Sequence, residues 1–352
     1  MKPISEAQEK KYIAKLLKSD EELYGQAHDA YQVALQEIED HLNFFIAEYG
    51  VAGLLKYVEL LKRDSDADRR RLFHFQRATL KDDGSQSQNR FKEYTRNAPI
   101  DRYHTLNSLI GFSIAGATIA TIKLLSRTLN SDFKRDVSRQ FNNNRLAKKA
   151  GADIVKEANI TKREILRNSE KIISTTINGN QWSDNIWLYN DNLVNNVQSL
   201  VAKSLRTGLK QTDVNQLFPS IKTAKPQTIT GMVETNDAYI RRIIITERAR
   251  VLDRATTQMF HSQGIAYFDW VTQPGACDKC EAIAEGGPYA VNDSSSPSIP
   301  EDSHPYCRCT KIAHTLPVKS GNASLALAGG LIAGALMVKK KDEQKKDNEH
   351  SN

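Results

Sequence analysis

The chain has 352 residues, 39% of them hydrophobic, which is adequate for a modest core and for two or three domains. Its formal net charge of +7 favours an anionic partner, nucleic acid in particular, although the solvated surface of a helical protein gives a similar excess. The P-loop, H-E-x-x-H, G-x-S-x-G and dinucleotide-binding patterns are absent from the sequence, which argues against the enzyme classes that carry them.

The N-terminal part of the chain predicts two helices. Apolar side chains recur every three or four residues along residues 5–50, which indicates one long amphipathic face, and Gly50 is a stop signal. A second helix is expected over Val51–Lys62, with these apolar residues facing inward: Leu54, Leu55, Val58 and Leu61.

The next segments alternate between polar and apolar composition. The charged run Lys62–Arg71 mixes both signs and favours a solvated helix face or turn over a basic docking site, and Leu80–Phe91 has the composition of a loop. Leu106–Leu125 is very apolar and approaches the length of a membrane span. Its Asn, Ser, Gly and Thr residues and Lys123 favour a buried helix–helix contact, with an oligomer contact as the alternative.

Helical patterns continue through the middle of the chain. A basic, Asn-rich helix is expected over Arg127–Ala150 with a break at Gly151, followed by a helix over Asp153–Ile173 that its aspartate caps. After a polar turn at Asn178–Ser183, the apolar spacing predicts an amphipathic helix over Asn192–Leu209.

A short helix then begins at a cap, Thr212 or Asp213, and ends at Phe218-Pro219. We interpret it and the preceding helix as an ordinary hairpin, because a helix this short cannot read a DNA groove. A longer helix is expected over Asp237–Gln263, and a strand over Ala266–Thr272.

Two features of these last elements bear on the cysteines that follow. Glu247 can pair with Arg250 along the helix surface, an interaction of about 0.3–0.5 kcal/mol if it is exposed. Trp270, in the predicted strand, is expected to pack against the cysteines.

All the cysteines of the chain lie in one stretch, as Cys277-x-x-Cys280 and His304-Pro-Tyr-Cys307-Arg-Cys309. A C-x-x-C pair points two thiolates at one place, and His304 and Cys307 repeat that spacing. The spacing predicts a closed, structural zinc site of three thiolates and one imidazole, with Cys309 as the substitute for His304. The Gly-, Pro- and Ser-rich loop between the pairs buries little apolar surface, so that a metal would hold it in place.

Other interpretations of the cysteines compete with a structural zinc site. Reduced thiols packed into a small core would need no metal. Disulfides are disfavoured, because the N-terminus lacks the apolar segment of a secretion signal and cytosolic thiols stay reduced. A catalytic zinc would need a general base, but the nearby acids Asp278, Glu281 and Glu285 match no catalytic pattern, and the H-x-E of the deaminases is absent.

The C-terminal stretch Ser324–Val338 is uncharged and is followed by a Lys-rich segment. It is shorter than the about 20 residues of a membrane span. This favours docking onto a partner or a loosely ordered tail over membrane insertion.

The order of features in the C-terminal half resembles the phage head morphogenesis family, the Mu F-like minor capsid proteins. The shared features are a helix with Thr246-Glu-Arg-Ala-Arg250, a Trp-containing strand, C-x-x-C, a Gly-rich turn, a Pro/Ser loop and H-P-x-C-R-C. A second piece, Trp182–Leu217, resembles the family's Trp, long helix and short turn, so the resemblance runs from Trp182 to Ile312. Family members often have an acidic residue before the first cysteine, where this chain has Gln273-Pro-Gly-Ala276.

The resemblance implies a virion protein of a tailed phage or prophage, packaged at low copy inside the head. We therefore expect a minor head protein that acts in head morphogenesis by binding the portal or the capsid interior, with packaged DNA as a further partner. It would pass through the host cytoplasm during assembly, and we expect no enzymatic activity, no small-molecule substrate and no membrane. The alternative is a toxin- or hydrolase-like effector domain of a mobile element, with His304 and Glu247 as catalytic groups.

The expected fold is mostly α. It comprises a helical N-terminal region over residues 1–150 and a helical middle region over 151–233. A small α+β module that zinc stabilises follows over 234–315, and an apolar and then Lys-rich tail over 316–352.

Overall fold

A computed structural model of the chain describes residues 3–80, 92–94, 96, 98, 100–175 and 180–315. The described chain is mostly helical and has a small sheet near its C-terminal end, which confirms the expected fold class. The longer helices are α1 (Glu6–Tyr49), α3 (Asp66–Leu80), α5 (Arg102–Lys149), α8 (Trp182–Thr207) and α10 (Ile229–Ser262). The shorter ones are α2 (Tyr57–Leu60), α6 (Lys162–Arg167), α7 (Ser169–Ile173), α9 (Gln211–Leu217), the 3-10 turn η1 (Ile221–Thr223) and α11 (Asp278–Glu285). The strands are β1 (Leu54–Leu55), β2 (Leu209–Lys210), β3 (Tyr267–Val271), β4 (Tyr289–Ala290) and β5 (Thr310–Ala313).

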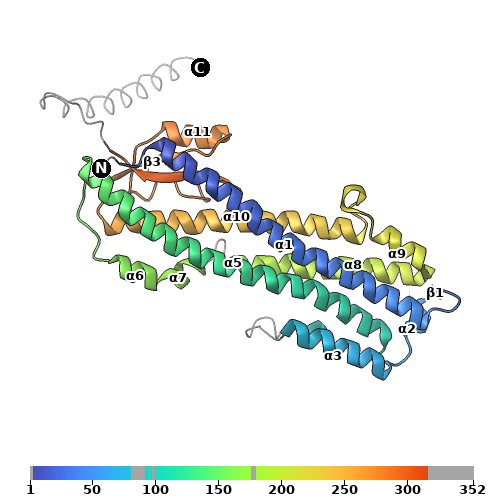
Figure 1. Ribbon diagram of the computed structural model, residues 1–352. Coiled ribbons are helices and arrows are strands. Elements are labelled where there is room, and N and C mark those ends of the chain that lie inside the picture. Colours follow the sequence, from blue (N-terminus) through green and yellow to red (C-terminus); the bar gives the residue numbers. More distant parts are fainter. Residues whose placement is uncertain are drawn as a thin grey trace, which may run out of the picture. The chain divides into compact units, whose positions relative to one another are not determined.

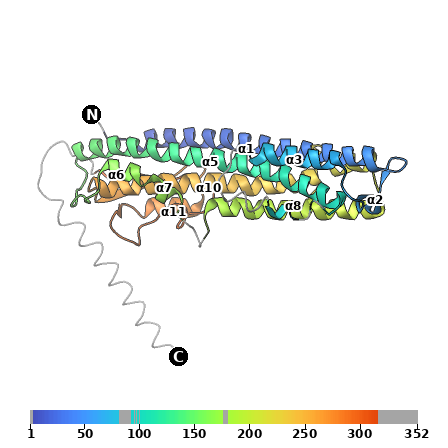
Figure 2. The same ribbon diagram turned by 90° about the horizontal axis from the view of Figure 1, so that it is seen from below.

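The helices α1, α5, α8 and α10 run side by side, with α5 and α10 each packed against the other three (Figures 1 and 2). The side chains between them form one continuous hydrophobic core. The apolar stretch of α5 is long and apolar enough to cross a membrane by composition, but 72% of that window is buried inside the protein. This agrees with the buried helix–helix contact predicted for Leu106–Leu125.

Capping side chains account for where several helices begin. Ser5 accepts a hydrogen bond from the amide of Gln8 and so opens α1, whose predicted apolar face is buried, and Gly50 closes it. Asp101 opens α5 in the same way, by accepting a hydrogen bond from the amide of His104. Thr228 caps α10, which therefore begins eight residues before the predicted start at Asp237.

The helix predicted over Val51–Lys62 is wrong. Ala52 and Gly53 have φ values of 53° and 75°, which turn the chain back so that Leu54–Leu55 pairs with β2 as a strand. Only the four residues of α2 remain helical, and Val58 is 60% exposed rather than buried. The apolar spacing was compatible with a helix, but it could not reveal the pairing with a strand far along the chain.

The helix predicted over Asp153–Ile173 is only partly present. Residues 152–160 are not helical, because they lie against the end of α10: the amide of Val155 donates to the carbonyl of Gly264, and that of Ala158 to the carbonyl of His261. Helix α6 begins after Thr161, which forms a capping box with Glu164, and α7 follows it. Similarly, α9 begins after Lys210, not at the predicted caps Thr212 or Asp213, and it ends at Phe218 as predicted.

Some predicted elements lie outside the described residues. These are most of the Leu80–Phe91 loop, part of the Asn178–Ser183 turn, and the whole of the tail with its apolar stretch Ser324–Val338.

The C-terminal sheet has the order β4-β3-β5 with antiparallel neighbours, and β3 confirms the predicted Ala266–Thr272 strand. Both β3 and β5 contact α1, and β5 also contacts α5 and α10 (Figure 1). A small apolar cluster of Ile13, Val271 and Ile312 joins α1 to the sheet. The buried ion pair between Lys311 Nζ and Asp253 Oδ1, 2.8 Å apart, joins the sheet to α10. The sheet is therefore packed on the long helices.

A buried network of charges connects the sheet region to three of the long helices. Asp20, on α1, accepts hydrogen bonds from both Arg248, on α10, and Arg308, in the loop before β5. Arg248 also donates from Nε to Asp132 Oδ2, on α5, at 2.8 Å. The side chains of Asp20, Arg248 and Arg308 are each 1% exposed, so every charge in the network depends on its partners for stabilisation.

We expect Asp20→Asn to lower the free energy of unfolding by roughly 3–5 kcal/mol, because it leaves two buried guanidinium groups without their shared counter-charge. Urea unfolding followed by circular dichroism measures the loss. The matched control is Glu22→Gln, which removes a 63%-exposed carboxylate from the same helix and should change stability by less than about 0.5 kcal/mol. Equal stabilities for the two variants would contradict this role of Asp20.

A second buried polar contact fixes the protonation state of a histidine. His41 Nδ1, on α1, lies 3.2 Å from Nη2 of Arg71, and its Nε2 lies 3.4 Å from Ser113 Oγ. A guanidinium only donates, so Nδ1 must be the unprotonated nitrogen and the ring is neutral. Burial and the charge of Arg71 lower the pKa of His41 to about 3.

The lowered pKa makes stability depend on pH in a defined direction. Between the ordinary value of 6.5 and about 3, the unfolded chain binds a proton at His41 that the folded chain does not. Stability is therefore complete above about pH 6.5 and falls as the pH is lowered. Relative to His41→Gln, which keeps the polar contacts without titrating, the wild type should lose roughly 2–3 kcal/mol between pH 7 and pH 4.5. Urea titrations of both proteins across this range measure the difference, and a constant difference would refute the assignment.

Candidate metal centre

The cysteines lie in two segments of the small module, the start of α11 and the chain that leads into β5. Cys277 is the residue that precedes α11, and Cys280 lies in the first turn of that helix. A helix places positions three residues apart on the same face, so both sulfurs point away from the helix in one direction. Cys307 and Cys309 lie in the extended segment that leads into β5, where alternate side chains point the same way.

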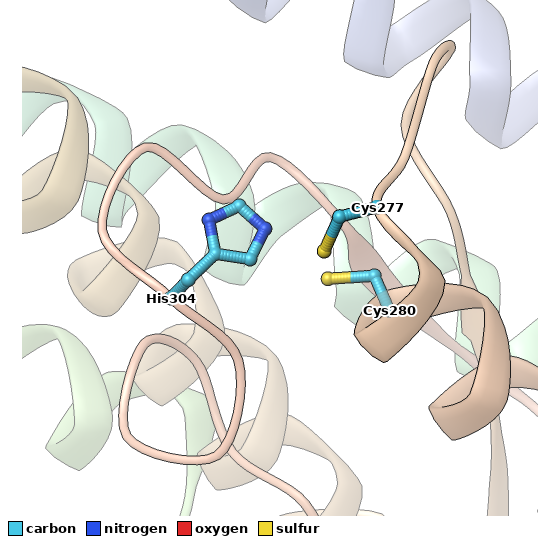
Figure 3. Close-up of side chains that lie close together, drawn as sticks. All are labelled: Cys277, Cys280 and His304. Atoms are coloured by element: carbon cyan, nitrogen blue, oxygen red, sulfur yellow. The ribbon is translucent and has the colours of Figure 1, made fainter.

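The five predicted ligands form two overlapping groups. The ligand atoms of Cys277, Cys280 and His304 lie within 4.8 Å of one another, and so do those of Cys280, Cys307 and Cys309. Figure 3 shows the side chains of the first group close together. Cys280 belongs to both groups. The structure thus brings together every residue that the sequence predicted for the site, and a bound cation could take Cys280 with partners from either group.

The separation of the Cys280 and Cys307 sulfurs suits a metal and is too long for a disulfide bond between them. Cys280 Sγ and Cys307 Sγ are 3.8 Å apart, and all the cysteines are free. A disulfide requires sulfurs about 2.05 Å apart. By contrast, neighbouring thiolates around a tetrahedral ion with metal–sulfur bonds of about 2.3 Å are separated by about 3.8 Å. The cluster is compatible with a structural metal.

His304 is oriented in the way that metal-binding histidines usually are. Its Nδ1 lies 2.6 Å from the carbonyl oxygen of Pro305. A carbonyl only accepts, so Nδ1 carries the proton and the lone pair of Nε2 is free for a ligand bond. The competing fourth ligand, Cys309, is only 3% exposed, whereas His304 is half-buried.

The protonation of the thiols depends on their mutual contacts. Burial, followed by the charge of Cys307, raises the pKa of Cys280 to about 12. A hydrogen bond to Cys309, followed by burial, raises the pKa of Cys307, and the same bond lowers the pKa of Cys309. Without a cation the cluster therefore retains protons, and coordination would displace them because thiolates are the ligands.

Contacts around the cluster hold the loop that carries His304 and Cys307. Lys279 Nζ, on α11, donates to the carbonyl of Ser303 at 2.8 Å. The amide of Tyr306, a residue with φ of 68°, donates to Thr246 Oγ1, on α10, over a long 3.4 Å. The amide of Arg308 donates to Gln273 Oε1 at 2.6 Å. Thr246 thus contacts the loop that carries His304 and Cys307.

Trp270 shares one hydrophobic cluster with Cys280, Cys307 and Cys309, as predicted.

Glu247 pairs with Arg250 as expected, but the pair is buried and not on the surface. It is 8% exposed and lies 2.7 Å from Nε of Arg250, which also donates to the carbonyls of Ile172 and Ile173 at the end of α7. Burial raises the pKa of Glu247. Its carboxylate is paired with the arginine that holds α7 to α10.

Two residues that matter for the site were not singled out as such from the sequence. Arg308 was noted only as part of the cysteine motif, yet its guanidinium reaches Asp20 on α1. Gln273 stands near the position where the resembling family often has an acid, and it fixes the backbone between Cys307 and Cys309. The position of Arg308 between two cysteines was a signal that the sequence offered for it. The sequence offered no such signal for Gln273.

Comparisons of the chain with models of protein families, with curated proteins and with solved structures found no match.

We expect the purified protein to bind about one metal ion per chain at the cysteine cluster and Cys280→Ser to bind none there, because Cys280 belongs to both ligand groups. Cys309→Ser should lose more metal than His304→Ala, since Cys309 is the more deeply buried ligand. Elemental analysis by mass spectrometry measures the content, and Glu281→Gln, an exposed position on α11, is the control that keeps every ligand. Only trace metal in the wild type would rule out the centre.

Proposed function

We propose that this chain is a minor head protein of a tailed phage or prophage, with a zinc-stabilised module that binds the portal or the capsid interior. The proposal rests on the resemblance of its C-terminal half to the Mu F-like family. One structural observation supports it: the two segments that carry the resemblance, Thr246–Arg250 and His304–Cys309, contact each other through Thr246 and Tyr306. The segments also share Asp20, through Arg248 and Arg308.

Zinc is the metal that the donor set favours. Thiolates and a neutral imidazole are soft to borderline ligands, which suit zinc and disfavour magnesium or calcium. Three of the thiols are buried, and the described loop leaves no catalytic acid in contact with them, so the expected role is structural. When bound, zinc would tie α11 to the loop before β5, and Cys277, Cys280 and Cys307 with Cys309 or His304 would hold it.

Binding rather than chemistry is the proposed mode of action. Glu247, which an effector enzyme of this kind would use, is already paired with Arg250. The formal net charge of +7 supports a further contact with packaged DNA, whose phosphates attract a basic surface. On this proposal the protein is found in the virion head and, during assembly, in the host cytoplasm.

Mass spectrometry of density-purified, nuclease-treated particles from an induced lysogen tests the proposal. We expect the chain at a few copies per portal ring, enriched over an abundant cytosolic host protein measured in the same fractions. A strain that expresses Cys280→Ser should yield particles with less of this chain, because its module is less stable. Recovery of the wild-type chain only from the soluble or membrane fraction would overturn the proposal.

A further inference from the structure

A second cluster of ligand-type side chains lies between α1 and α10, away from the cysteines in sequence. His28 projects from α1, and Glu234 and Asp237 lie one turn apart on α10. Their nitrogen and oxygen atoms lie within 4.8 Å of one another. None of the three takes part in the function proposed above, and the inference drawn from them does not depend on it.

Asp237 is the most constrained member of this cluster. Its side chain is 1% exposed, and its Oδ2 accepts a hydrogen bond from Tyr24 at 2.5 Å and lies 2.8 Å from His28 Nδ1. Its other oxygen, Oδ1, is buried and has no hydrogen-bond partner in the described part of the chain. A buried carboxylate oxygen without a partner is destabilising, so a ligand or a water molecule at this atom would be favourable.

The charge of Asp237 is also balanced differently from that of the other most deeply buried aspartates, those at most 5% exposed. Asp20, Asp132, Asp136 and Asp253 are buried, and each forms an ion pair with an arginine or lysine. Among the described residues, Asp237 and Glu234 have no arginine or lysine within ion-pair distance. Arg241, one turn along α10, is paired with Glu21, so that among the described residues His28 is the only basic group that forms an ion pair with Asp237. A bound cation would supply the missing positive charge.

The geometry points to a site for a first-row divalent cation, held by His28, Glu234 and Asp237. One imidazole nitrogen with two carboxylates is a borderline-to-hard donor set, which suits manganese, iron or cobalt better than a thiolate-preferring ion. The 2.8 Å between His28 Nδ1 and Asp237 Oδ2 is close to the roughly 3 Å between adjacent ligands of an octahedral ion with bonds of about 2.1 Å.

Neighbouring side chains complete the arrangement. Tyr24 donates to Asp237, and Gln32 Nε2 donates to Glu234 Oε1 at 3.1 Å, so each carboxylate is oriented by a hydrogen bond from a neighbouring side chain. His28 and Glu234 are only partly buried, which leaves the remaining coordination positions open to water. On binding, the Nδ1 proton of His28 would leave or move to Nε2, and a metal–nitrogen bond would replace the contact with Asp237. The ion would link α1 to α10.

Titration of the full chain with Mn²⁺ tests the site, because manganese prefers oxygen and nitrogen ligands and competes poorly for the cysteine cluster. The loss of the free Mn²⁺ signal in electron paramagnetic resonance gives the stoichiometry and the affinity. We expect one bound ion per chain, and the same result in a Cys280→Ser background. Glu234→Gln should weaken binding at least about tenfold, and Asp237→Asn should abolish it.

The matched control is Glu22→Gln, an exposed carboxylate on α1 that should leave binding unchanged. Circular dichroism of each variant establishes folding, and Glu234→Gln changes a partly exposed side chain, so its result stands if Asp237→Asn unfolds. If His28 is only a protonated counter-ion, the wild type binds no Mn²⁺ at millimolar concentration. That outcome, or equal binding by Glu234→Gln and Glu22→Gln, would overturn the site.

Discussion

The buried carboxylate of Asp20 joins the long helices to the loop that carries Cys307 and Cys309. It is almost fully buried, and it accepts hydrogen bonds from Arg248 on α10 and from Arg308 beside the cysteines. Burying an ion is costly unless its charge is matched and its hydrogen bonds are made, so these three groups stabilise one another only when all are in place. Because each comes from a different segment, the network forms only when α1, α10 and the cysteine loop have reached their final positions. The loop that carries the candidate metal ligands is thus positioned by a residue near the other end of the chain.

Side chains point alternately to opposite sides of an extended chain. One short segment can therefore contribute thiols to the cysteine cluster and a guanidinium to the helical core. Cys307, Arg308 and Cys309 are consecutive, so the two thiols point to one side and the guanidinium to the other. The thiols join the cluster around Cys280, while Arg308 enters the helical core. Gln273 fixes the backbone between them by accepting from the amide of Arg308. A change on either side of this segment is therefore transmitted to the other through a fixed stretch of backbone, which couples the stability of the metal centre to the packing of α1.

The sequence predicted those elements whose conformation depends on neighbouring residues. It did not predict the conformation of segments that depend on partners far along the chain. The apolar stripe of α1, its stop at Gly50 and the buried stretch of α5 follow from helical spacing, and the cysteine spacing was enough to predict one cluster. The segments around Leu54 and Asp153 were predicted as helix, because their spacing is compatible with one, but their conformations depend on pairing with β2 and with the end of α10. Asp20 resembled any surface carboxylate, since its partner Arg308 lies 288 positions away. Spacing alone could not choose between His304 and Cys309, because both reach Cys280 in three dimensions.

Helix α10 shows why so many polar groups are tolerated in the interior. Its buried side is not a uniform apolar stripe: Asp237 meets α1, Arg250 meets the end of α7, and Asp253 meets Lys311 of β5. Thr256 adds a hydrogen bond to Asp136 on α5 at 3.1 Å. An apolar helix could slide by one turn along its neighbours at modest cost, whereas a one-turn shift of α10 would leave each of these groups buried without its partner. The polar contacts therefore define the register of the helices along one another, and the hydrophobic core supplies most of the driving force for packing them. A protein built this way holds its cysteine loop in one position relative to α1.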